Sequence, residues 1–339
     1  MRAAAPGSAG REQVSRLWAA ALVLPALAAA AQDTRLDGYA EWRKGDVLIV
    51  DGQRVKSSPR TKWQGAAHGL DGVTLGYEVK VRGTRARDGS VLAQEVEAHP
   101  NGNAMFEGDL KNAFDERERQ YLQRGRMYDD DGKGGVAHDY GRLHEEGKDV
   151  ERVRGIAGSL VPASMTAAAF RVYVVDNKEW NAMAAPNGSI YVFSGLLHDL
   201  DDDEVAIVLG HELAHATHEH SRKQFRKTLI IQLAALGVAA GAEGIDSTAK
   251  RVALQAVALV GATAWSSGYG RSHEDQADRV GLRYAYEGGY AVSKGPGLWM
   301  KFAKKYGEGN RALNFFFSDH SQALVRAHNL EREIAYNYR

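Results

Sequence analysis

Residues 201–220 read DDDEVAIVLGHELAHATHEH, and the organisation of the chain is best followed outward from this stretch. The acids that open it are typical of a helix N-terminus, where negative charge interacts favourably with the helix dipole. The VAIVL run that follows is apolar nearly all round, which indicates a helix buried in a core. His211 and His215 are four residues apart, so one helix face carries both imidazoles at a spacing that suits a single zinc ion. Glu212 flanks this face, where it can accept a proton from a water molecule activated by the metal.

A zinc hydrolase needs a third protein ligand and an open fourth position. The metzincin pattern would place a histidine at 221, where this chain has Ser221. His218 shares a helix face with His215, but three ligands from one straight helix converge poorly on a tetrahedral ion. We therefore expect His218 and His220 to lie outside the ligand set, in the shell around it or at the surface.

Residues 272–278 (SHEDQAD) supply better candidates for the remaining positions. A helix through this segment places Glu274 and Asp278 on one face, because they are four residues apart. Glu274 would then reach the metal, while Asp278 would accept the N–H of a liganding imidazole and fix its tautomer. Spacing alone does not distinguish Glu274 from Glu243 or Glu287 as the ligand.

Three separate segments together resemble peptidase family M48, the zinc metallopeptidases that include HtpX and the CAAX prenyl proteases. They are residues 181–196 (NAMAAPNGSIYVFSGL), the HELAH motif, and Glu274-x-x-Ala277-Asp278-x-x-Gly281. Their order and spacing resemble the soluble periplasmic branch of the family, over residues 150–338.

The resemblance implies that one Zn²⁺ ion is held by His211, His215 and Glu274, with Glu212 as the general base. It also implies the fold class. We expect an α+β protein with a mainly α-helical, zincin-type metallopeptidase domain that contains a small β-sheet, of the gluzincin type with glutamate as third ligand.

The family also carries a Ser/Thr-x-His-Pro motif followed by an arginine six residues after the histidine. Here the motif reads SDHS at 318–321, with Arg326 at the matching offset. The resemblance implies that His320 approaches the zinc, either to polarise the oxyanion or to cap the site at rest, and that Arg326 orders acids around the site. Ser321 replaces the usual proline, so an ordinary loop histidine stays open as the alternative for His320.

Peptide-bond hydrolysis is the reaction expected of such a site. Residues 189–193 (SIYVF) are expected to form an edge strand beside the cleft, where Ile190, Tyr191 and Val192 would pair with an extended polypeptide. Main-chain pairing gives little sequence selectivity, which favours unfolded or misassembled exported proteins as substrates. A catalytically silent zinc protein that acts as a chaperone or assembly factor is the alternative, and an intramembrane prenyl-processing enzyme is disfavoured by the absence of long apolar spans.

The flanking sequence predicts a division into four parts. Residues 1–31 have the basic start, apolar middle and small-residue end of a secretory signal peptide, which predicts a periplasmic protein; an uncleaved inner-membrane anchor is the alternative. Residues 36–100 alternate in strand-like fashion between turns and predict a small all-β, barrel-like domain. Residues 101–149 are expected to be a charged linker with a helical segment, and residues 150–339 the metallopeptidase domain.

Two further features concern the predicted β-domain and the metallopeptidase domain. Residues 79–84 (VKVRGT) resemble small barrel-like domains of unknown function in exported bacterial proteins. The apolar stretches at 229–240 and 252–265 are too short for ordinary membrane spans and predict buried helices, with a membrane-touching hairpin as the minor alternative.

Composition excludes several classes of protein. The 339 residues contain 43 Lys plus Arg and 43 Asp plus Glu, so the net charge of zero argues against a nucleic-acid partner. The absence of cysteine excludes a disulfide scaffold, a thiolate metal site and a cysteine nucleophile. Contact with the membrane surface or with envelope proteins stays open, as does the oligomeric state.

Overall fold

The computed structural model describes residues 33–100, 107–130, 135–161, 170–218, 220, 271–307 and 323–338. The expected signal peptide, the two apolar stretches at 229–240 and 252–265, and His320 lie outside these ranges. Across the described ranges, no helix has the length and hydropathy needed to cross a bilayer. Helices and two sheets combine in one chain, so the α+β class expected from the sequence is confirmed.

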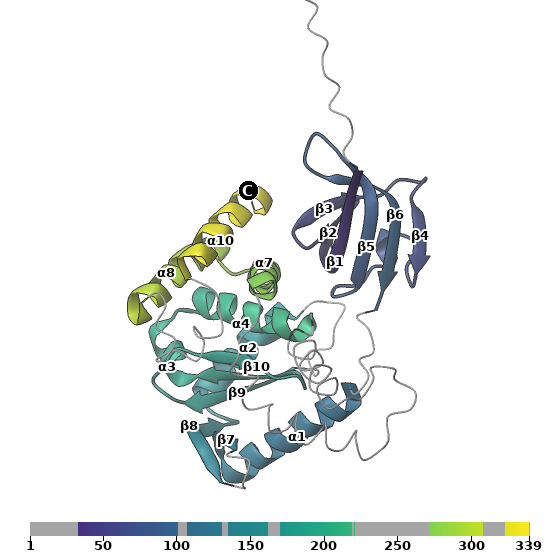
Figure 1. Ribbon diagram of the computed structural model, residues 1–339. Helices are drawn as coiled ribbons and strands as arrows, with labels where there is room; N and C mark the ends of the chain where they lie inside the picture. The colour runs from purple at the N-terminus through teal and green to yellow at the C-terminus, as the bar shows by residue number, and fades with distance from the viewer. Residues whose placement is uncertain are drawn as a thin grey trace, which may run out of the picture.

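The N-terminal sheet folds into a barrel that lies beside α4 and α7 in Figure 1. Its strands are β1 (Asp33–Lys44), β2 (Val47–Val50), β3 (Gln53–Lys56), β4 (Lys62–Gly65), β5 (Glu78–Arg85) and β6 (Val91–His99). The order is β3-β2-β1-β5-β6-β4, and a short parallel pairing of β3 with β6 closes the sheet on itself. Burial alternates along β5, where Val79 and Val81 face the barrel core, as the period of a half-buried strand requires.

The second sheet has the order β10-β11-β9-β8-β7. Its strands are β7 (Arg126–Asp130), β8 (Val136–His144), β9 (Arg171–Asp176), β10 (Ala182–Ala184) and β11 (Ser189–Phe193). This order corrects the expectation that residues 189–193 form the edge strand, because β11 pairs with β9 on one side and with β10 on the other. The turn before β11 closes a hairpin, in which Gly188 N donates to the carbonyl of Ala185, and so β10 takes the edge.

Helices cover both faces of this sheet (Figure 1). Helix α1 (Glu107–Arg124) lies on one face, and α2 (Lys148–Leu160), α3 (Ser194–Asp199) and α4 (Asp202–Thr217) lie on the other. Helices α7 (Arg271–Glu287), α8 (Gly295–Tyr306) and α10 (Ala323–Asn337) pack on α4 and on one another. Short 3₁₀ turns occur at Leu70–Gly72, in the barrel, and at Val292–Lys294. Alternate residues of β11 divide between two cores: Ile190 and Val192 pack with α2 and α4, whereas Tyr191 and Phe193 pack with α1. The sheet is therefore the middle layer of this part of the chain.

The stretch expected as a charged linker belongs to this layered core. Strand β8 pairs antiparallel with β9, and α1 packs Phe114 and Tyr121 against the aromatic face of the sheet. Glu118 of α1 is buried and accepts hydrogen bonds from Arg171 Nε at 2.7 Å and from Ser189 Oγ at 2.6 Å. The many charges of this segment concealed a folded element because some of them pair with groups of the sheet.

Helix α4 begins where the sequence predicts. Asp201 accepts from the backbone N–H of Glu204, and the Glu204 side chain accepts from the backbone N–H of Asp201, which makes a capping box. Apart from Asp202, Asp203 and Ala216, the helix is buried, in agreement with its unbroken apolar run.

The contact between α4 and α7 is set by two glycines. A Cβ atom added at Gly281 of α7 would lie 2.4 Å from the backbone nitrogen of His211, and one added at Gly210 of α4 would lie 2.4 Å from the carbonyl oxygen of Gly281. No side chain separates the two backbones at this point, so the helices cross at the closest distance that their main chains permit.

We expect Gly281→Ala to destabilise the protein by about 1–3 kcal/mol, because the added methyl must push two backbones apart. The matched control is Gly155→Ala in α2, where the added Cβ meets no described atom within 4 Å and alanine gains about 1 kcal/mol of helix propensity. Denaturant unfolding of both variants measures the difference. Equal stability of the two variants would contradict the tight crossing.

Candidate metal centre

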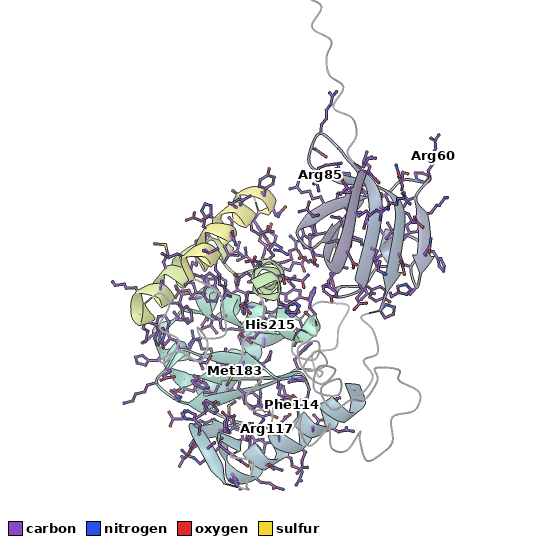
Figure 2. All side chains as sticks on the ribbon, in the orientation of Figure 1. Arg60, Arg85, Phe114, Arg117, Met183 and His215 are labelled. Carbon is purple, nitrogen blue, oxygen red and sulfur yellow. The ribbon has the colours of Figure 1, made fainter. Side chains whose placement is uncertain are left out.

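Three buried side chains converge where α4 crosses α7. His211 and His215 come from α4 and Glu274 from the first turn of α7, and their ligand atoms all lie within 4.8 Å of one another. The two Nε2 atoms are 3.0 Å apart, and oxygens of Glu274 lie 3.5 Å from His211 Nε2 and 3.4 Å from His215 Nε2. In Figure 2, His215 lies near the end of α4 that faces the barrel.

An acid and an arginine hold the outer side of His211. Asp278, one turn after Glu274 on α7, has Oδ1 at 2.9 Å from His211 Nδ1. Arg326 of α10 donates two hydrogen bonds to Asp278, from Nε to Oδ2 at 2.8 Å and from Nη2 to Oδ1 at 2.6 Å. Its guanidinium carbon lies 3.5 Å from the centre of the Trp299 ring, and its Nη1 lies 3.5 Å from Glu274. Arg326 is fully buried, and these contacts explain how the core accommodates its charge.

The chemistry of these donors fits a metal ion. An ionised Asp278 only accepts, so the tautomer of neutral His211 that bonds to it carries its proton on Nδ1 and presents a lone pair on Nε2. Arg326 Nη2 also lies 3.0 Å from Nδ1 and 3.4 Å from Nε2 of this ring. The Nε2 atom of His215 faces the same point, and the Glu274 carboxylate adds oxygen lone pairs. Three lone-pair donors that face one another inside a core repel unless a cation lies among them, and two imidazoles with one carboxylate are a recurrent ligand set for such a cation.

Burial shapes the proton affinities of the acids in this cluster. It raises the pKa of Glu274 to about 7, against the opposing effect of Arg326. Burial also raises the pKa of Glu212 well above its usual range, and the charge of Glu274 adds to the effect. Burial would raise the pKa of Asp278 as well, but the guanidinium of Arg326 outweighs it and holds that pKa well below its usual range. A cation among the donors would favour the ionised form of Glu274.

Glu212 lies beside these donors on α4. Its side chain is 1% exposed, and the backbone N–H of Ala184 in β10 donates to its carboxylate. The acid is thus held between the metal-binding cluster and the edge strand of the second sheet.

The remaining expected residues have different outcomes. Ile190, Tyr191 and Val192 are buried in the interior strand β11, so their side chains are core residues and their strand does not offer a free edge. His320 lies outside the described residues, and its role stays a prediction.

Of two further polar residues close to the cluster, His220 was expected in the shell around the ligands or at the surface, and Gln276 was not identified from the sequence. His220 Nδ1 lies 2.9 Å from His215 Nδ1, and His220 Nε2 lies 2.9 Å from Gln276 Oε1. Both side chains are buried. The available signal was weak: a fourth histidine, five residues after the motif, and a glutamine on the face of α7 that should be apolar.

Comparisons with known proteins give two family matches. The sequence profile described as Peptidase family M48 matches residues 145–334, and a domain of unknown function (DUF5666) matches residues 37–97.

Individual relatives match over part of their length. The mitochondrial metalloendopeptidase OMA1 of Bos taurus is 31% identical over 48% of this chain and 32% of its own length. Metalloprotease YcaL of Escherichia coli is 29% identical over 49% of this chain and 62% of its own. The putative beta-barrel assembly-enhancing protease of Vibrio cholerae is 26% identical over 40% of this chain and 29% of its own. The chain thus spans less than two thirds of each of these relatives.

We expect Asp278→Asn to weaken metal binding by about 10–100-fold, because the amide no longer fixes the His211 tautomer and leaves Arg326 without its counter-charge. Competition with a chromophoric chelator measures the affinity. Asp275→Asn, on the same helix but bonded to Asn329, should stay near the wild-type value. Equal losses in both variants would argue for a general effect of charge on α7.

Proposed function

Because the chain belongs to peptidase family M48, we propose that it is a zinc-dependent metalloendopeptidase with Glu274 as the third ligand. The observation that carries the proposal is the buried convergence of His211, His215 and Glu274 next to Glu212. Two imidazoles and one carboxylate leave a fourth position for water or substrate, as catalytic zinc sites require. A zinc ion held there supplies Lewis-acid polarisation of the scissile carbonyl and lowers the pKa of a water molecule.

Glu212 performs the proton transfers in this proposal. Its carboxylate accepts the proton of the attacking water and later delivers it to the nitrogen of the leaving amine. Burial raises its pKa and makes the carboxylate a stronger base. The hydrogen bond from Ala184 fixes one side of the carboxylate, so the proton is taken up on a defined side.

Within the described ranges β10 pairs with a strand on one side only, and we infer that its other side best suits an extended substrate. Ala185 N donates to Ser189 O and Phe193 N donates to Asn181 O, so the odd-numbered residues of this strand bond to β11. The backbone groups of Ala182 and Ala184 therefore point away from the sheet. The Ala184 amide already meets Glu212, which would place a paired polypeptide beside the catalytic acid. We therefore propose that the substrate pairs with β10 and not, as expected from the sequence, with residues 189–193.

Recognition through the main chain favours segments that are extended before they bind. We infer that the substrates are unfolded or misassembled polypeptides, since folded proteins rarely present a free strand. The N-terminal signal pattern supports export to the periplasm. The names of two relatives, beta-barrel assembly-enhancing proteases of Vibrio cholerae and Yersinia pestis, support a role in the quality control of envelope proteins.

We expect Glu212→Gln to keep its zinc and to lose at least about 100-fold of the rate of casein cleavage, because the amide cannot accept the proton of water. Metal analysis and a gel-based degradation assay measure the two quantities. Glu151→Gln, an exposed position of α2, is the matched control and should cleave like wild type. A zinc-loaded wild type that prevents aggregation but cleaves nothing would overturn the protease proposal in favour of a binding function.

A further inference from the structure

The N-terminal barrel docks directly on the helices that carry the metal ligands. A Cβ atom added at Gly76 of the barrel would lie 2.9 Å from the carbonyl oxygen of Thr217, the last residue of α4. Arg283 of α7 lies 4.4 Å from the ring centre of Trp42 in β1. His218 Nε2 lies 3.3 Å from the carbonyl oxygen of Ala40. The barrel therefore packs against the end of α4 and one side of α7.

Hydrogen bonds connect this interface to the ligand His215. His215 Nδ1 contacts His220 Nδ1 at 2.9 Å, and His220 Nε2 contacts Gln276 Oε1 at 2.9 Å. Gln276 Nε2 then donates to Glu41 Oε1 of β1 at 3.3 Å and to Asp51 Oδ1, just after β2, at 2.8 Å. The four side chains from His215 to Glu41 are 0–3% exposed, so water does not compete for these bonds.

The two carboxylates at the end of this path determine which group donates and which accepts in each of its hydrogen bonds. Ionised Glu41 and Asp51 only accept, so the amide nitrogen of Gln276 must face them and its oxygen must face His220. His220 therefore carries its proton on Nε2, and its Nδ1 is left as an acceptor. That acceptor takes the proton of His215 Nδ1, which leaves the lone pair of His215 on Nε2, toward Glu274 and His211.

Other contacts hold the side chains of this hydrogen-bond path in place. Arg279 of α7 donates to both oxygens of Glu41, which supplies the counter-charge for a buried acid. The ring of His273 stacks on that of His220, with centres 4.5 Å apart and planes 15° apart.

We propose that His220, Gln276 and Glu41 are positioning residues that set the tautomer and ring orientation of His215, so that the N-terminal barrel is a working part of the metal site. This inference rests on the proposed zinc function. It gives His215 the same kind of support from the barrel that His211 receives from Asp278 and Arg326. The domain that matches DUF5666 thereby acquires a function in this chain.

A pair of substitutions at His220 tests the link to the ligand. His220→Asn places an amide oxygen where Nδ1 lies and can still accept from His215, whereas His220→Gln reaches toward Gln276 but leaves His215 without its acceptor. We expect the Asn variant to bind zinc nearly as tightly as wild type and the Gln variant to bind about 10–100-fold more weakly. Chelator competition measures the affinity, and the visible spectrum of the Co²⁺-substituted protein reports the ligand geometry.

A second pair tests the contribution of the barrel. The double variant Glu41→Gln/Asp51→Asn replaces two carboxylates, which only accept, by amides of similar size that can also donate. The direction of the Gln276 bonds is then no longer fixed, and zinc binding should weaken by about 10-fold. Its control, Asp37→Asn/Glu78→Gln, makes the same changes at exposed positions of β1 and β5 and should leave affinity and spectrum unchanged. Circular dichroism of the metal-free proteins checks that each variant is folded.

The outcomes separate this inference from the proposed function. Wild-type protein that binds no zinc would overturn both. Wild type that binds zinc and cleaves casein, with equal affinity in the Asn and Gln variants at 220, would overturn the positioning role and leave the protease proposal standing. Loss of affinity in the Gln variant and in the barrel double variant, with both controls intact, would support the inference.

Discussion

The close approach of α4 and α7 at Gly210 and Gly281 is the constraint on which the rest of the site depends. The atoms that can hold a metal must meet within a few ångströms, but they belong to helices that are far apart in the chain. A side chain at either glycine would separate the two backbones next to His211 and move Glu274 away from the histidines. Backbone packing thus fixes the distance between the histidines of α4 and Glu274 of α7 before any metal binds.

Once the helices are fixed, the polar groups around the donors determine their chemistry. Asp278 and Arg326 sit behind His211, and the ring of Trp299 covers the arginine. A buried guanidinium with no counter-charge would be costly, and so would the carboxylate alone. Together they form a rigid pair that keeps one carboxylate ionised while burial raises the pKa of Glu274 and Glu212. Carboxyl groups of one small volume therefore differ widely in proton affinity.

The sequence predicted what local periodicity and spacing encode. The start of α4, the alternating strands β5 and β6, strand β11 and the helix with Glu274 and Asp278 follow from capping, alternation and four-residue spacing, whereas β7 and β8 lie in the stretch expected to be a linker. The edge position of β10 was missed because strand order depends on pairing between distant segments, which periodicity does not report. The contact of His220 with Gln276 and Glu41 was missed for the same reason: it joins the barrel to α7 across most of the described chain.

The placement of Glu41 and Arg326 has a consequence for how the molecule is made. One residue comes from the first strand and the other from the last described helix, yet both contact the surroundings of the same two histidines. Contacts of such long sequence separation form late in folding, because the loop entropy must be overcome first. A chain in which only α4 has formed lacks both Glu41 and Arg326 near its histidines. In the proposed protease, the surroundings of the metal ligands would be complete only when the first strand and the last described helix are both in place.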